Sequence, residues 1–391
     1  MKRVYGTRKS VMESEEEEDT AVKCRERRRR RMAMRRMAAG AASSSRGGES
    51  LKRGVKTSGE PGVVLQTSSS TAAAAIMSLI SIMETPQPPV YGMMSVIGRQ
   101  REMEDEVSVR TNLCRPEING FRPVHFFGVF DGHGGGHVSA LCKENMHSIM
   151  EEELMRVKVI GDESDGGELW RTAINRCFER MDEMAVRLCL CGGLGTSSNI
   201  CRCSPQLSFM GSTAVVSLLT KENIFVANCG DSRAVLCRNG RPIPLTVDHK
   251  PDREDERRRI EGCGGRIMFA DGARVEGILA MSRAIGDRLL KQWVTSEPEI
   301  LITRREEGDE CLILASDGLW DVLSSELACK IVHECFSQNG SVAPRIQGDE
   351  GAMGEALYSS RSDSAATLLI RLALGRRSTD NISVIVIDLR K

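Results

Sequence analysis

Short apolar and β-branched runs that stop at turn residues recur along the chain after about residue 90, and this pattern predicts strands. The runs cover residues 125–130, 224–228, 232–238, 241–245, 311–315 and 382–389. Asn239-Gly240 separates the third run from the fourth and is the strongest short-range signal for a hairpin. We therefore expect neighbouring strands to be paired antiparallel.

Apolar positions repeat every three or four residues in other segments, and this period predicts helices. One helical face collects Leu169, Ala173, Cys177, Phe178, Met181, Met184 and Leu188. Residues 252–261 are highly charged and end near Gly262, which predicts a surface helix, and residues 365–374 predict a short apolar helix. Strands joined by hairpins, with helices in separate blocks, predict an α+β fold.

The first 89 residues lack both periods. An acidic run at 13–19 is followed by an Arg-rich run at 23–36, and small or polar residues dominate 38–75. Such segments cannot bury enough apolar surface to fold. The apolar stretch 72–83 is shorter than the roughly 20 residues that cross a bilayer, so it predicts a short packed or docking helix. We expect a disordered, low-complexity head at 1–89 and one large domain at 90–391.

Composition narrows the class of protein. The 391 residues are 40% hydrophobic and 28% charged, as in an ordinary globular chain, which excludes wholesale disorder. Lys/Arg and Asp/Glu balance at 54 each, but residues 1–60 hold 17 basic against 9 acidic residues. Residues 1–60 are therefore net positive by eight charges, and residues 61–391, which contain the body, are net negative by eight. A body of that sign lacks the cationic field that grips nucleic acid.

The Arg-rich run fits three interpretations. It is typical of a nuclear import signal, of an exposed helix that contacts nothing, and of a tether for nucleic acid. Nuclear import is the interpretation we favour. It places the protein in the nucleus, with the cytoplasm as a second compartment.

Fourteen cysteines in a chain of this length, with no secretory leader evident, are expected to be reduced and intracellular. Four of them gather in one short segment, as Cys189, Cys191, Cys201 and Cys203. Four thiolates at this spacing could hold zinc, form a redox-sensitive loop, or remain ordinary reduced thiols.

Carboxylates recur at the ends of the predicted strands. Glu104-Asp105 precedes one strand, Asp131 and Asp317 each follow one, and Asp380 precedes the last. A single Asp-Gly is more typical of a turn, but several acidic oxygens without accompanying His or Cys suit Mg²⁺ or Mn²⁺. Two such ions could activate a water and stabilise an in-line displacement at phosphorus. The pattern indicates a hydrolase for phosphate esters.

These positions lie within ordered motifs by which residues 91–389 resemble the type 2C metal-dependent Ser/Thr protein phosphatases. The motifs are Tyr91-Gly92 through Met103-Glu104-Asp105, Phe127-Gly-Val-Phe-Asp131-Gly132-His133-Gly134-Gly135, Gly211-Ser-Thr-Ala214, Asn228-Cys-Gly-Asp231-Ser-Arg233, Asp248-His-Lys-Pro251, Gly277-Ile-Leu-Ala-Met-Ser-Arg-Ala-Ile-Gly-Asp287, Ala315-Ser-Asp317-Gly-Leu-Trp-Asp321 and Asp380-Asn381. The resemblance is strongest to the plant clade that acts in abscisic acid signalling. It implies a central antiparallel β-sandwich flanked by helices, with a binuclear metal site at one edge.

The resemblance also implies a role for each site residue. It implies two Mg²⁺ or Mn²⁺ ions, with Asp131 bound to both. Asp317 and Asp380 would bind one of them, and Glu104 and the Gly132 carbonyl would bind the other. Asp248 would bind a third ion more weakly. Asp105 would orient the metal-bridged water that attacks phosphoserine or phosphothreonine directly. His133 resembles the general acid for the departing oxygen, although a histidine in a Gly-rich turn also has a purely structural interpretation.

The sequence departs from the family pattern at the phosphate clamp. Gln100 stands where the family usually has arginine, and Gln supplies no charged fork. Arg99 and Arg101 flank it, and we expect one of them to bind phosphate instead. Glu106 replaces a common alanine and adds a negative charge near an anionic substrate.

A second departure concerns partners. In the resembled clade a tryptophan anchors the hormone receptor, and Ala270 stands at that position, while Glu276 replaces a usually apolar residue. An aromatic anchor of this kind is often worth more than ~2 kcal/mol. We therefore expect a negative regulator of the pathway that escapes the receptor. Its substrates, by resemblance, would be sucrose-non-fermenting-related kinases.

Two other classes of function stay open. Gln100 and Glu106 weakly favour a catalytically weak, phosphatase-like module that sequesters kinases, whereas the complete set of carboxylates disfavours it. A nucleic-acid-binding protein rests only on the Arg-rich run, and the net negative body disfavours it.

Overall fold

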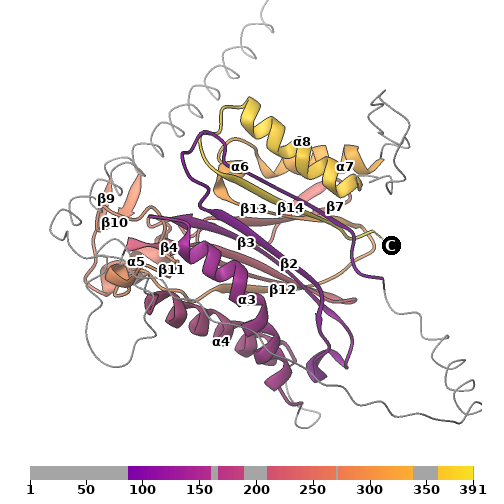
Figure 1. The fold of residues 1–391 in the computed structure, drawn as a ribbon, viewed down its shortest axis with the longest axis horizontal. Coiled ribbons are helices and arrows are strands. Elements are labelled where there is room, and N and C mark those ends of the chain that lie inside the picture. The colour runs from indigo at the N-terminus through magenta and orange to yellow at the C-terminus, as the bar shows by residue number, and fades with distance from the viewer. Residues whose placement is uncertain (1–86, 160–165, 189–208, 270–271, 338–359, 391) are drawn as a thin grey trace, which may run out of the picture.

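The computed structural model describes residues 87–159, 166–188, 209–269, 272–337 and 360–390. Two β-sheets face each other, and helices cover the outer face of each (Figure 1). All pairings between the described strands of both sheets are antiparallel. The expected α+β fold, a β-sandwich flanked by helices, is confirmed.

The first sheet has the strand order β1-β14-β13-β7-β8. Its strands are Tyr91–Val96, Ile382–Asp388, Asp309–Ala315, Arg233–Arg238 and Arg241–Pro244, in that order. Strands β7 and β8 form the predicted hairpin, with Arg238 opposite Arg241 and Asn239-Gly240 in the turn. Asn239 and Gly240 both have positive φ, of 50° and 68°, as this tight turn requires.

The second sheet has the order β11-β4-β3-β5-β6-β12, and β2 also pairs with β3. Its strands are Ile285–Gly286, Gly211–Ser212, Val124–His133, Ala214–Leu219, Asn223–Cys229, Glu299–Arg304 and, for β2, Asp105–Cys114. A small separate ribbon pairs β9, Ile267–Phe269, with β10, Ala273–Val275.

Six α-helices lie among the described residues, together with the 3₁₀ turns Glu117–Asn119 and Arg288–Leu290. Helices α3 and α4, His137–Arg156 and Gly166–Val186, cover the second sheet, and α7 and α8, Ser325–Ser337 and Arg361–Gly375, cover the first. The short α6, Asp317–Trp320, begins directly after β13, and α5, Glu254–Gly262, lies near the β9–β10 ribbon. None of the helices in the described ranges is long and apolar enough to cross a membrane.

The core has three apolar layers, because each sheet is covered on both faces. All ten residues of β3 are buried. Phe127 and Val129 face the other sheet, whereas Phe126 and Phe130 pack under α3 and α4. The third layer lies between the first sheet and its helices. Two-sided burial explains why the predicted strands are continuous apolar runs rather than alternating ones.

One predicted helical face is partly wrong. Helix α4 buries Ala173, Cys177, Phe178 and Met181 as expected, but Met184 is 39% exposed. Its other buried positions are Trp170, Ile174 and Ala185. The buried stripe is therefore rotated from the predicted one because Trp170 stacks on Phe225 of β6, with ring centroids 4.1 Å apart.

Candidate active site

The row of side chains between the sheets changes from apolar to acidic at one end of β3. Side chains alternate along a strand, so Asp131 and His133 continue the inward-facing row of Phe127 and Val129. Asp105, the first residue of β2, pairs with Asp131 in the strand register. Two buried carboxylates therefore stand side by side where the apolar core ends.

The first sheet contributes Ser316 to the same place. Its Oγ donates to Asp105 Oδ2 at 2.7 Å and accepts from the Ser383 backbone N at 3.0 Å. The Ser316 backbone N in turn donates to the Ser383 carbonyl at 3.0 Å. Asp317 follows Ser316 and opens α6, so this hydroxyl brings the end of β13 to the start of β2.

Asn381 draws Glu104 and Asp380 together in the same way. Its Oδ1 accepts from the Glu104 backbone N at 2.7 Å. Its Nδ2 donates to the carbonyls of Ile97 and Glu102, at 2.9 and 3.1 Å. The segment before β14 is thus tied to the turn between β1 and β2.

Two glycines let these segments approach closely. A Cβ at Gly132 would lie 2.5 Å from the Glu104 carbonyl oxygen, to which the Gly132 N donates at 3.1 Å. A Cβ at Gly318 would lie 2.0 Å from the Asn381 carbonyl oxygen and 3.3 Å from the Asp380 Cβ. The Asp-Gly pairs are therefore required by packing at this site, and neither is merely a surface turn.

Five carboxylates, those of Glu104, Asp105, Asp131, Asp317 and Asp380, are at most 7% exposed. Burying several like charges is costly without a compensating cation, and an oxygen-only donor set suits a hard ion. The donor chemistry therefore fits Mg²⁺ or Mn²⁺. Within the part of the chain that the structure describes, no three His, Cys, Asp or Glu side chains are already grouped as an ion site.

Asp248 is engaged by an arginine. Arg233 donates through Nε and Nη2 to the two oxygens of Asp248, at 2.9 and 2.8 Å. The guanidinium also lies 5.3 Å from the ring centroid of Trp320. A cation at Asp248 would have to share this carboxylate with Arg233.

The two candidate arginines of the phosphate clamp are exposed. Arg99 and Arg101 lie in the turn after β1, whose Ile97 carbonyl accepts from both Gln100 N and Asn381 Nδ2. Because Asn381 holds this turn beside Glu104, either guanidinium lies within a few residues of the buried carboxylates.

Glu106 is not oriented as its neighbour Asp105 is. Successive side chains point to opposite faces of a strand, and Glu106 faces α3, where Lys143 Nζ donates to it at 2.7 Å. The negative charge that Glu106 adds is therefore paired with Lys143 on the helical face.

Glu276 has a local role. It adopts a left-handed conformation with φ of 50° and accepts from Arg266, from the backbone N at 2.7 Å and from Nη2 at 2.8 Å. These hydrogen bonds lower the pKa of Glu276.

Ala270 lies outside the described residues, as do Cys189, Cys191, Cys201 and Cys203. The nine cysteines in the described ranges are free thiols.

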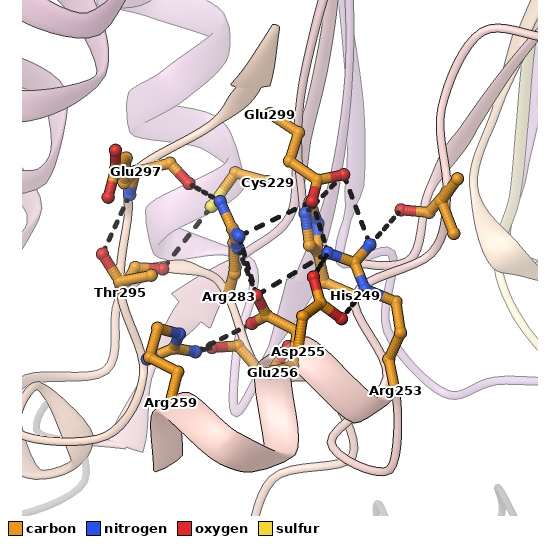
Figure 2. A network of polar contacts seen from close by, with 12 residues as sticks. Cys229, His249, Arg253, Asp255, Glu256, Arg259, Arg283, Thr295, Glu297 and Glu299 are labelled. Carbon is orange, nitrogen blue, oxygen red and sulfur yellow. Dashed lines mark hydrogen bonds and ion pairs between the residues drawn. The ribbon is translucent and has the colours of Figure 1, made fainter. Parts of the chain in front are cut away.

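Figure 2 shows an ionic network around α5 that the sequence did not predict. Glu256 of α5 is 1% exposed and accepts from Arg283 at 2.7 and 3.0 Å and from Arg259 at 2.8 Å. Burial alone would raise its pKa, but the hydrogen bonds from Arg283 and Arg259 outweigh it and lower the pKa to about 2. The predicted surface helix is thus anchored through a buried acid, a position that charge periodicity could have indicated.

Comparison with known proteins agrees with this architecture. The family model described as protein phosphatase 2C matches residues 90–382. "Probable protein phosphatase 2C 75" of Arabidopsis thaliana is 57% identical over 315 residues, covering 78% of this chain and 75% of that protein. "Probable protein phosphatase 2C 24" of the same plant is 49% identical over 306 residues, covering 78% and 79%.

The fold is also that of a solved phosphatase. The serine-threonine phosphatase 2C from Toxoplasma gondii has a TM-score of 0.58 at 24% identity, over 78% of this chain and 97% of that one. The chain therefore belongs to the protein phosphatase 2C family. It is a type 2C Ser/Thr protein phosphatase with plant relatives, and this family depends on metal ions, generally Mg²⁺ or Mn²⁺.

Proposed function

We propose that the protein hydrolyses phosphoserine and phosphothreonine at the polar end of the sandwich, with two divalent ions held by Glu104, the Gly132 carbonyl, Asp131, Asp317 and Asp380. The observation that carries this proposal is the junction of Asp105 with Ser316 and of Glu104 with Asn381. These contacts gather carboxylates from three distant segments at one place.

The ions, when bound, would supply positive charge to the phosphate and lower the pKa of a water molecule. Asp105, fixed by Ser316, would orient that water by accepting a hydrogen bond from it. Arg99 or Arg101 would bind the phosphate oxygens in place of the arginine lost at Gln100. His133 would donate a proton to the departing Ser/Thr oxygen. Asp248 would serve a third, weaker ion only by loosening its pair with Arg233.

The finer function rests on similarity to the plant clade. We propose that the substrates are protein kinases of the sucrose-non-fermenting-related class and that the enzyme is a negative regulator of abscisic acid signalling. Ala270, in place of an anchoring tryptophan, supports weak or absent inhibition by the hormone receptor. The Arg-rich run at 23–36 supports a nuclear location, with the cytoplasm second.

One experiment tests both the proposed substrate and the proposed escape from the receptor. It follows dephosphorylation of an autophosphorylated kinase of that class, with and without receptor and hormone. The proposal expects turnover that the receptor and hormone leave unchanged. Tight hormone-dependent inhibition would overturn receptor escape, and the absence of turnover on the kinase would overturn the substrate.

One observation favours a second candidate function, a module that binds kinases without turnover. Gln100 stands where the family usually has arginine, so this position supplies no charged ligand for the phosphate. A well-folded, metal-loaded protein that binds the phosphorylated kinase and releases no phosphate from any peptide would make this candidate the better account.

A further inference from the structure

His133 is hydrogen-bonded to an acid that the phosphatase roles above do not use. Its Nε2 lies 2.7 Å from Asp287 Oδ2, and the two residues are 5% and 1% exposed. They are 154 residues apart in the chain. His133 ends β3, two residues after Asp131, whereas Asp287 follows β11.

Asp287 is held in a conformation that non-glycine residues rarely adopt. Its φ and ψ are both 48°, in the left-handed region. Such a conformation persists only where the surroundings of the residue fix it, commonly at functional sites. Here the Asp287 N donates to the Met210 carbonyl at 2.9 Å, and the Gly286 N donates to Asp182 Oδ1 of α4 at 2.8 Å. Lys291 pairs with the same Asp182 oxygen, at 2.5 Å.

The neighbouring strand leaves room for this pair. Gly211 of β4 is registered with both His133 and Gly286. A Cβ at Gly211 would lie 2.1 Å from Asp287 Oδ2 and 2.4 Å from His133 Nε2. Strand β3, strand β4 and the turn after β11 therefore meet at the contact between the Asp287 carboxylate and the His133 imidazole.

We infer that Asp287 is a positioning residue for His133. By accepting a hydrogen bond from Nε2–H, the Asp287 carboxylate fixes the ring orientation and tautomer, as a carboxylate does for a catalytic histidine in other hydrolases. The opposite nitrogen, Nδ1, then delivers a proton to the leaving group.

This inference rests on the proposed acid role of His133. As the attacking water oxygen bonds to phosphorus, the P–O bond to the Ser/Thr side chain breaks, and its electron pair goes to the Ser/Thr oxygen, which takes the Nδ1 proton. Solvent returns to the ring a proton released by the attacking water. Asp287 itself keeps its charge throughout.

Asp287→Asn tests the inference, because asparagine tolerates the left-handed conformation better than most residues. The full chain is assayed with Mn²⁺ on a phosphoserine peptide and on p-nitrophenyl phosphate, whose leaving group needs no proton. We expect kcat on the peptide to fall about 10²-fold, the size of general acid catalysis, with KM unchanged and a much smaller loss on the aryl phosphate. His133→Ala should show the same selectivity. Asp309→Asn, which removes a buried carboxylate that is paired with Arg238 and is not one of the candidate site residues, should show none.

The outcomes distinguish failure of the positioning role of Asp287 from failure of the acid role of His133. Equal losses on both substrates for His133→Ala would remove the acid role itself. Selective loss for His133→Ala without selective loss for Asp287→Asn would overturn the positioning role alone.

A second readout needs no turnover. In ¹⁵N-histidine-labelled protein without added metal, we expect one hydrogen-bonded Nε2–H resonance that disappears in His133→Ala and shifts in Asp287→Asn. Its persistence, unshifted, in Asp287→Asn would contradict the inference.

Discussion

Ser316 and Asp105 join the two sheets of the sandwich through a single buried hydrogen bond of 2.7 Å. The serine follows β13 of the first sheet, and the aspartate opens β2 of the second. Both lie where the apolar layer between the sheets gives way to carboxylates. The position of Asp105 relative to Asp317 and Asp131 therefore depends on this contact.

Ser316→Ala should leave a buried carboxylate short of one donor, which costs about 1–3 kcal/mol. We expect a fall in kcat larger than the change in KM, since the turn that carries Arg99 and Arg101 is held separately by Asn381. Steady-state kinetics and urea unfolding measure the two effects. Ser217→Ala is the matched control, because the buried Ser217 hydroxyl has no hydrogen-bond partner in the described part of the chain. Equal effects of the two changes on kcat would contradict the role of Ser316.

Arg99→Ala and Arg101→Ala test which guanidinium binds phosphate. Loss of the clamp should raise KM for a phosphopeptide by about tenfold, equivalent to ~1.4 kcal/mol, with less effect on kcat. Arg110→Ala controls for the loss of an exposed charge, because its Nη1 donates only to the adjacent Val109 carbonyl in the described structure. If neither change moves KM, the phosphate is bound by other groups.

Glu106→Ala should be nearly silent, although Glu106 follows a catalytic candidate directly in sequence. Its charge faces α3 and is paired with Lys143 near the surface, and such pairs contribute at most about 1 kcal/mol. We expect kcat/KM within a factor of two of the unaltered enzyme. Lys143→Ala leaves the charge unpaired and serves as the comparison. A severalfold rise in kcat/KM for Glu106→Ala would show that the substrate senses this charge.

Glu256→Gln should destabilise the fold by about 3 kcal/mol at pH 7, because it leaves the half-buried Arg283 and Arg259 without their acid. The pKa of Glu256 is lowered from 4.5 in the unfolded chain to about 2 in the folded one. Its stabilisation is therefore complete above pH 4.5 and is lost as the pH falls toward 2.

Urea unfolding across pH 2 to 7 measures this effect, and the curve for Glu256→Gln should be flatter below pH 4.5. Glu254→Gln, at a side chain that is 86% exposed, should stay within about 0.5 kcal/mol of the unaltered protein. A Glu256→Gln curve that parallels that of the unaltered protein would contradict the assigned pKa.

Local patterns predicted much of the fold. The Asn239-Gly240 hairpin follows from turn chemistry and is confirmed. The predicted strand 125–130 lies within β3, but β3 does not stop at Asp131-Gly132 and continues to His133. Helix α3 was not predicted, because charged residues interrupt its apolar positions, although Val138, Cys142, Met146 and Met150 are buried at four-residue spacing.

The candidate site was predictable only in part. Carboxylates at strand ends could be read from the sequence, since each lies next to a strand signal. The partners of those carboxylates could not. Asp287 reaches His133 because it adopts positive φ and because Asp182, 104 residues before Gly286, holds the turn. The orientation of Glu106 follows from the start of β2 at Asp105, because successive side chains of a strand point to opposite faces.

Phosphate release from a phosphoserine peptide, compared between the unaltered protein and Asp131→Asn across a titration of Mn²⁺ and with EDTA, tests the central claim most directly. The account predicts turnover that requires the ion, that EDTA abolishes and that Asp131→Asn reduces by at least about 10²-fold while the protein stays folded. Turnover that persists in EDTA, or in Asp131→Asn at the same Mn²⁺ concentration, would contradict it.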